Sequence, residues 1–161
     1  MLKRCYSESY QKGARSYIGC SVSEEFKSFQ SFMDWATKQV GFYEDDFQLD
    51  KDILVEGNRI YSSDTCCFVP SHLNVAMIKP SCDLPLGVNL DKSRGTYKSV
   101  VGMFGKPVQI GRYKTVEDAF VAYKYFKEAY IKQLAIENQS KLAPKVFDTL
   151  VNYEIKHYSC I

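Results

Sequence analysis

Two carboxylates stand two residues apart in the most acidic part of the chain. Asp50 and Asp52 lie in the segment Glu44–Glu56. This segment contains six acidic residues and one basic residue, Lys51, so its local charge is −5. Mg²⁺ prefers oxygen ligands, and residues at this spacing share one face of an extended strand. The pattern predicts a site for Mg²⁺ or another divalent metal. A solvated strand edge is the alternative.

A basic segment follows at residues 84–114. It holds six cations against a single acid, Asp91, for a local charge of +5, whereas the whole chain carries +2. Its cations are Lys92, Arg94, Lys98, Lys106, Arg112 and Lys114. Aromatic residues are interleaved with them. Phosphates need cations and a small sheet fits the major groove, so the segment is typical of a nucleic-acid platform. An ordinary solvated sheet face has the same composition, and both interpretations stay open.

Three short strands and a helix would carry these cations. Strand patterns cover residues 85–91, 96–104 and 107–113, and turn residues separate them. Thr115 and Asp118 form a capping-box variant before a helix. The apolar stripe of that helix runs through Val116, Ala119, Phe120, Tyr123, Phe126, Tyr130 and Leu134. We therefore expect an α+β fold, in which one long helix covers one face of a three-stranded antiparallel sheet and leaves the other in solvent.

The acidic segment leads into a predicted succession of strand, turn, strand and helix. Gly57-Asn58 predicts a two-residue hairpin turn between strands at 53–55 and 59–61. Ser71 is a suitable cap for the short helix that follows.

Helices are expected at both ends of the chain. Helical spacing of apolar residues predicts one core helix over 23–40, starting at Ser23, and a closing helix after Pro144. The predicted organisation is a helical and ββα segment over 1–80, a sheet domain over 84–138 and a closing helix in 139–161.

The composition indicates a globular protein, with 45% hydrophobic and 25% charged residues. We expect no membrane-spanning helix, because no apolar run is long enough, and no secretory signal, because residues 1–19 lack an apolar core. The six cysteines form no C-x-x-C pair and indicate reduced thiols in a cytoplasmic protein. A zinc site on Cys66 or Cys67 with His72 would match no standard ligand spacing.

About a third of the chain resembles the APETALA2/ethylene-response-factor type of DNA-binding domain. The matching motifs are Gly87-Val88, Tyr97-Lys98-Ser99-Val100-Val101, Gly105-Lys106, Ile110-Gly111-Arg112-Tyr113-Lys114-Thr115 and Glu117-Asp118-Ala119-Phe120-Val121-Ala122-Tyr123. Members of that family lay the three-stranded sheet in the major groove. The resemblance thus implies double-stranded DNA as partner and places Arg94, Lys98 and Arg112, with Tyr97, on the DNA face. Lys106 and Lys114 join them from the basic segment.

The middle of the chain resembles the HNH (ββα-metal) nucleases of phage and homing-endonuclease type. The similar residues are Leu49-Asp50-Lys51-Asp52-Ile53, Gly57-Asn58, Tyr61, Cys66, Phe68-Val69 and Asn74. Such enzymes hydrolyse a phosphodiester with a histidine base and one divalent metal. This chain has Lys51 where the family has that histidine, and Thr65 at the middle asparagine position.

The resemblance implies a divided set of roles. Asp50 or His72 is the candidate base, Lys51 would contact phosphate, and Asp50, Asp52 and Asn74 would hold the metal. A histidine on a helix surface is the alternative for His72.

Three functions follow from these patterns. The first is a phage-encoded, metal-dependent DNA endonuclease acting in the host cytoplasm. The second is a DNA-binding or inhibitory protein that kept the nuclease scaffold without cleavage. The third is a factor that binds a host protein, with the acidic segment as its contact surface.

Overall fold

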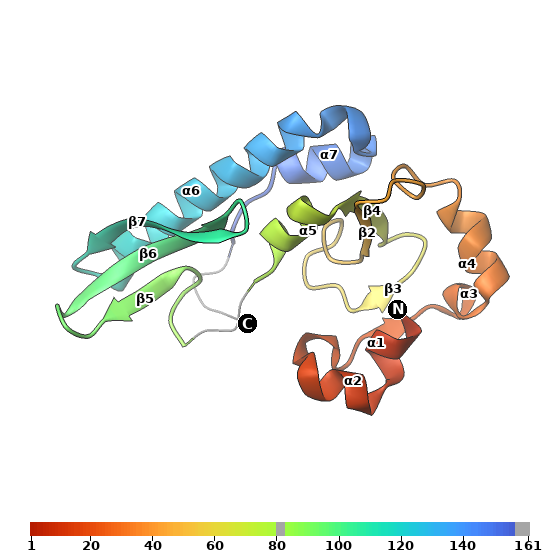
Figure 1. The fold of residues 1–161 in the computed structure, drawn as a ribbon, viewed down its shortest axis with the longest axis horizontal. Helices are drawn as coiled ribbons and strands as arrows, with labels where there is room; N and C mark the ends of the chain where they lie inside the picture. Colours follow the sequence, from red (N-terminus) through yellow and green to blue (C-terminus); the bar gives the residue numbers. More distant parts are fainter. Residues whose placement is uncertain (80–82, 157–161) are drawn as a thin grey trace. The chain divides into compact units, whose positions relative to one another are not determined.

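The computed structural model describes residues 1–79 and 83–156 of the chain (Figure 1). They form two compact units. The first contains residues 1–71 and 140–149, and the second contains residues 72–139 and the chain from Leu150 onward. Each unit is therefore built from two separate stretches of sequence. The expected boundary near residue 80 differs from this division, and the expected closing segment 139–161 is shared between both units.

The first unit combines short helices with two small sheets. Its helical elements are α1 (Leu2–Tyr6), α2 (Glu8–Gly13), η1 (Arg15–Tyr17), α3 (Glu24–Lys27) and α4 (Phe29–Ala36). Its strands are β1 (Ser21–Val22), β2 (Phe47–Asp50), β3 (Ile60–Tyr61) and β4 (Cys67–Pro70). β1 pairs with β3 in parallel, and β2 pairs with β4 antiparallel, so that Asp50 lies opposite Cys67.

Aromatic and sulfur-bearing side chains fill the core of the first unit. The buried members of this cluster are Cys5, Cys20, Val22, Phe26, Tyr61 and Cys66. Trp35 packs against Phe26 with 4.8 Å between ring centroids. Burial raises the pKa of the Cys66 thiol to about 12, so this sulfur stays protonated at neutral pH. Cys5, Cys20, Cys66 and Cys67 are free thiols, as expected, while Cys82 and Cys160 lie outside the described residues.

The prediction of a single helix over residues 23–40 is wrong, because two helices occupy this range. Ser23 caps a helix as predicted, but Ser28 adopts an extended backbone and its Oγ accepts a hydrogen bond from the Ser31 amide, so a second helix begins there. A serine hydroxyl competes with the helical hydrogen bonds of its own backbone and favours caps. Phe29, the first residue of this second helix, is consequently 76% exposed.

The hairpin expected at Gly57-Asn58 is also wrong. Gly57 adopts a positive φ of 74°, which fits a turn, but residues 53–55 form no strand and Ile60–Tyr61 pairs with β1. Asn58 explains the difference. Its Nδ2 donates to the carbonyl oxygens of Lys51 and Ile60, each at 2.7 Å, so the side chain organises a loop.

The second unit contains the sheet and the long helix that the sequence predicts. Its elements are α5 (Ser71–Met77, of which Ser71 belongs to the first unit), β5 (Val88–Asp91), β6 (Thr96–Met103), β7 (Lys106–Tyr113) and α6 (Val116–Glu137). The strands form one antiparallel sheet in the order β5-β6-β7. Thr115 caps α6 by accepting from the Asp118 amide at 3.1 Å, which confirms the capping-box variant.

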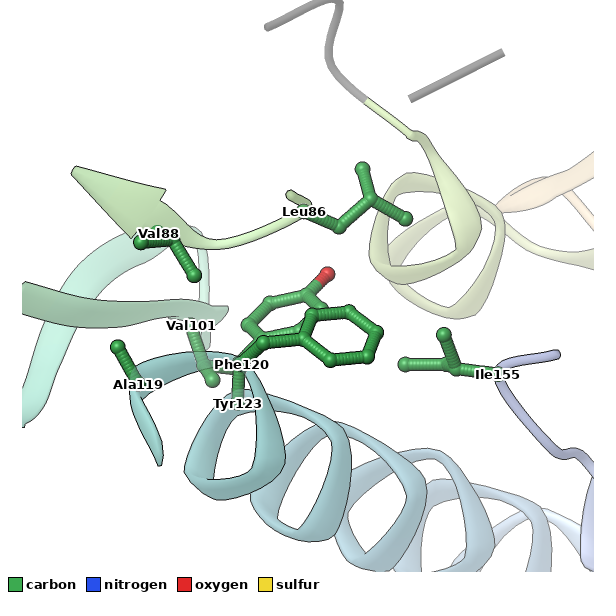
Figure 2. Close-up of a cluster of buried hydrophobic side chains, with 7 residues drawn as sticks. All are labelled: Leu86, Val88, Val101, Ala119, Phe120, Tyr123 and Ile155. Carbon is green, nitrogen blue, oxygen red and sulfur yellow. The ribbon is translucent and has the colours of Figure 1, made fainter. Parts of the chain in front are cut away.

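One face of this sheet is closed by α6. Figure 2 shows Val88 and Val101 of the sheet facing Ala119, Phe120 and Tyr123 of the helix. Gly87 permits the close approach, because its φ is +73° and a Cβ there would meet the Tyr123 ring at 1.9 Å. Leu86 and Ile155 complete this cluster. The α+β class, the three strands and the covering helix are thus confirmed.

The chain ends in two further helical elements, η2 (Gln139–Lys141) and α7 (Pro144–Val151). The predicted closing helix is therefore present from Pro144 to Val151. Ile155 lies beyond this helix and is buried in the cluster of the second unit.

Candidate functional site

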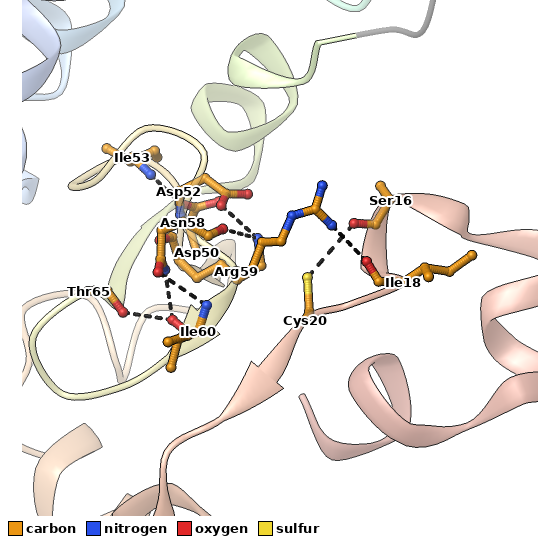
Figure 3. Close-up of polar contacts among 11 residues, drawn as sticks. Ser16, Ile18, Cys20, Asp50, Asp52, Ile53, Asn58, Arg59, Ile60 and Thr65 are labelled. Carbon is orange, nitrogen blue, oxygen red and sulfur yellow. Dashed lines mark hydrogen bonds and ion pairs between the residues drawn. The ribbon is translucent and has the colours of Figure 1, made fainter. Parts of the chain in front are cut away.

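The Asp50 side chain is built into a tight loop at the end of β2. Its Oδ1 accepts hydrogen bonds from the amides of Asp52 at 2.6 Å and Ile53 at 2.7 Å (Figure 3). Burial raises the pKa of the Asp50 carboxyl, because desolvation outweighs these two bonds to the charged form. β2 ends at Asp50, so the expectation that Asp50 and Asp52 share one strand face is wrong.

Lys51 points into the first unit and is only 7% exposed. Its Nζ donates to Asp52 Oδ1 at 2.6 Å and to the Asn58 carbonyl oxygen at 3.0 Å, and it lies 5.8 Å from the centroid of the Tyr61 ring. Burial raises the pKa of the Tyr61 phenol well above its ordinary value. Lys51, predicted to contact phosphate, is therefore committed to holding the 50–60 loop.

His72 and Asn74 lie on α5, in the second unit, whereas Asp50 and Asp52 belong to the first. His72 is exposed and its Nε2 lies 3.3 Å from Asn138 Nδ2, while Asn74 is half-buried. The predicted metal ligands and candidate bases are therefore divided between the two units.

Both loop carboxylates already have partners within the loop. Two amides already occupy Asp50 Oδ1, and the Lys51 ammonium neutralises Asp52. Across residues 1–79 and 83–156, no three His, Cys, Asp or Glu side chains are placed to hold a metal ion. Mg²⁺ binding at Asp50, Asp52 and Asn74 stays a prediction.

The sheet of the second unit carries a charged cluster on the face away from α6. Lys98 on β6 lies directly opposite Arg112 on β7. Asp91, at the end of β5, contacts both: its Oδ2 is 3.0 Å from Lys98 Nζ and 3.5 Å from Arg112 Nε. The Ser93 hydroxyl donates to Asp91 Oδ1 at 2.7 Å. This bond, with Lys98 and Arg112, lowers the pKa of Asp91 to about 2, so one anion holds two cations in place.

Polar side chains extend this cluster into a row across all three strands. Asn89 on β5 pairs with Lys98, which pairs with Arg112, and side chains at paired positions share a face. Asn89 and Arg112 are exposed. Sequence reasoning did not single out Asn89, although its place two residues before Asp91 in a strand puts both on one face.

The other residues predicted for the DNA face do not belong to this row. Arg94 is exposed in the turn between β5 and β6, and Lys114 is exposed just after β7. Lys106 opens β7 at the hairpin tip. Tyr97 neighbours Lys98 in the strand, so its side chain lies on the opposite face, where it packs against the hydrophobic cluster. Tyr97 is therefore not a member of the open face.

A buried cation that sequence reasoning missed lies on α6. Lys127 is 7% exposed, whereas Phe126, which was assigned to the apolar stripe, is 42% exposed. Lys127 follows Tyr123 by four residues and precedes Tyr130 by three, which places all three side chains on one side of the helix. Its position on the apolar stripe of the helix, beside Tyr123 and Tyr130, is the sequence signal that could have identified this buried lysine.

No helix within the described residues is long and apolar enough to cross a membrane. Comparisons of the chain with protein-family models, with curated proteins and with solved structures find no match.

Proposed function

We propose that the second unit binds double-stranded DNA with the open face of its three-stranded sheet. The observation that carries this proposal is the cross-strand row of Asn89, Lys98 and Arg112, in which Asp91 fixes the two cations. A β-ribbon enters the major groove, where arginine can make two hydrogen bonds to guanine and asparagine two to adenine. The row presents both side-chain types from one rigid surface.

The charges around the row support the same surface. Arg94 and Lys114 are exposed next to the sheet, where they would contact phosphates on either side of the groove. Asp91 neutralises one of the two cations it holds, so the attraction to DNA depends on these flanking residues as well. This arrangement favours modest affinity that depends strongly on salt.

The test is binding of a labelled 20-base-pair duplex over a series of KCl concentrations, followed by fluorescence anisotropy. Lys98→Ala and Arg112→Ala should each weaken binding and reduce the slope of log affinity against log salt by about one. Lys132→Ala is the matched control, because it removes one exposed charge from α6. Equal binding by all three variants would contradict the proposal, as would an absence of DNA affinity at low salt.

DNA cleavage is a second candidate, favoured by one observation only. Asp50 is a partly buried carboxyl with a raised pKa, and such groups are frequent among catalytic residues. The discriminating variant is Asp50→Asn, whose amide oxygen can still accept the two loop amides while the negative charge is lost. Plasmid nicking in Mg²⁺ or Mn²⁺ that disappears in Asp50→Asn would support cleavage. Undiminished nicking by that variant, or no nicking with either metal, would reject it.

A further inference from the structure

A cavity of about 290 Å³ lies inside the second unit, apart from the charged row of the sheet. Its walls come from α5, from the tip of the β6–β7 hairpin and from the middle of α6. Among its lining residues are Val75, Phe104, Lys106, Tyr123, Lys127 and Tyr130. This volume is at the lower end of the range for small-molecule sites, so it suits a ligand no larger than a mononucleotide.

The described lining contains two lysines and a histidine but no acid. Lys106, Lys127 and His72 contribute to the wall, and none of the described lining residues is Asp or Glu. The other lining side chains are apolar or aromatic. A ligand that complements this surface is negatively charged at one end and apolar over the rest.

Lys127 is the buried charge of this cavity. Its Nζ donates to the carbonyl oxygen of Ala76, and an ammonium has two further protons to donate. The structure gives Lys127 no ion pair among the described residues. Burial without an acid partner lowers the pKa of Lys127, because desolvation penalises the charged form. An anion in the cavity would offset that penalty.

His72 lines the same cavity and has a neighbour that indicates its tautomer. Asn138 Nδ2 donates to the Leu134 carbonyl at 2.8 Å, which fixes the orientation of the amide. The contact of 3.3 Å from the same Nδ2 to His72 Nε2 is therefore a hydrogen bond that the ring accepts. In the neutral imidazole, Nδ1 then carries the proton and can donate.

Two aromatic side chains stiffen the opposite wall. The Tyr130 hydroxyl accepts a hydrogen bond from the Phe104 amide at 2.9 Å, and the two rings meet edge to face with centroids 5.4 Å apart. Phe104 has a positive φ of 51°, which is unusual for a side chain with a Cβ. This bond holds the strained hairpin tip at the cavity, so the wall is formed before any ligand binds.

We propose that this cavity binds a nucleoside monophosphate. Its phosphate contacts Lys127, Lys106 and His72, and its base packs against Tyr123, Tyr130 or Phe104, since aromatic rings stack on bases and cations bind phosphate oxygens. The site is distinct from the DNA-binding face of the sheet, and the inference does not depend on that face.

The experiment is an NMR titration of the ¹⁵N-labelled protein with four separate probes: adenosine monophosphate, thymidine monophosphate, benzoate and inorganic phosphate. The nucleotides should shift the amides of residues 72–78 and 102–107. Lys127→Met should weaken nucleotide binding about tenfold or more, as expected for loss of one charge-assisted hydrogen bond. Lys132→Met, which removes an exposed charge from the same helix, should leave it unchanged.

A second pair of variants keeps the test valid if Lys127→Met unfolds. Val75 lines the cavity and is 55% exposed, so both Val75→Glu and Val75→Lys should fold. Val75→Glu should weaken nucleotide binding severalfold by repulsion, whereas Val75→Lys should bind at least as well as the unchanged protein. Equal binding by these two variants would overturn the proposal.

The probes themselves separate the remaining outcomes. Inorganic phosphate that binds as tightly as the nucleotides would overturn the role of the aromatic wall. Benzoate that binds more tightly than both nucleotides would overturn the assignment to nucleotides, and the absence of shifts with every probe would overturn the site. Arg112→Ala should leave nucleotide binding intact while it weakens DNA binding, so failure of one proposal is distinguishable from failure of the other.

Discussion

Lys51 in the first unit and Lys127 in the second are both 7% exposed, yet their surroundings differ. Lys51 has an acid, Asp52, and a backbone carbonyl as partners, and an aromatic ring lies beneath it. Among the described residues, Lys127 has a backbone carbonyl as its one hydrogen-bond partner, and it lines a cavity. A buried cation whose partners are complete stabilises the fold, while one that lacks an anion is available to a ligand. The comparison distinguishes a lysine held by an acid of its own unit from one that, under the proposal above, binds a ligand.

The largest effect is expected for Lys51→Met. This change should lower the free energy of unfolding of the first unit by about 2 kcal/mol, because the buried Lys51 ammonium no longer donates to the Asn58 carbonyl and to Asp52. Trp35 lies in that core, so urea unfolding followed by tryptophan fluorescence is the measurement. Asp52→Asn is the control, since the Asp52 side chain is 52% exposed and its ion pair contributes only about 0.5 kcal/mol. Unchanged stability of Lys51→Met would remove the structural role.

Lys127→Met should lower the free energy of unfolding of the second unit by less, about 1 kcal/mol or below. The Ala76 carbonyl loses one donor, but the cost of burying a charge disappears and methionine occupies a similar volume. Hydrogen exchange of the fully buried Val101 reports the stability of the second unit. A loss as large as that of Lys51→Met would show that Lys127 is structural too, and the comparison would fail.

The lowered pKa of Lys127 also predicts a pH dependence. Between its folded-state pKa and its unfolded value of about 10.4, the unfolded chain binds more protons at this lysine, so stability rises with pH. Lys127→Met should lack this rise. Hydrogen exchange compared between neutral pH and about pH 9.5 measures it, a range where the buried Tyr123, whose pKa is raised, stays protonated. If stability changed with pH in the same way in the unchanged protein and in Lys127→Met, the lowered pKa of Lys127 would be contradicted.

The smallest effect belongs to Asp91, the acid of the sheet face. Its pKa is lowered to about 2, so its contribution to stability is complete above an unfolded value of about 3.9 and is lost as pH falls toward 2. Asp91→Asn should therefore lose less stability on acidification than the unchanged protein, as circular dichroism between about pH 5 and 2 would show. An identical acid transition would mean that Lys98 and Arg112 are not held by this carboxylate.

The second unit could be predicted from the sequence because its signals are local. Turn residues separate the three strands, and Thr115 with Asp118 marks the start of α6. The first unit resisted prediction because single polar side chains redirect its backbone. Ser28 divides an apparently continuous helix, and Asn58 bonds to Lys51 and Ile60 rather than forming a hairpin turn.

The candidate sites show the same contrast. Lys98 and Arg112 could be predicted from charge and strand pattern, whereas the register that aligns Asn89 with both of them is a tertiary property. Neither buried lysine could be found from charge alone, because a lysine ordinarily lies in solvent. Lys127 donates to the Ala76 carbonyl of α5, a contact 51 residues away in the sequence that the sequence alone does not show.

The division of the chain has a consequence for the order of events during synthesis. Leu142 and Val146 belong to the first unit, and Leu150 and Ile155 to the second; all four are buried. Translation adds residues one at a time from the N-terminus, at about 5–20 per second. The core cluster of the first unit, within residues 5–66, is synthesised early, although Leu142 and Val146 join that unit later. The cluster of the second unit cannot close until Ile155 has left the ribosome, so the first unit should form its core before the second.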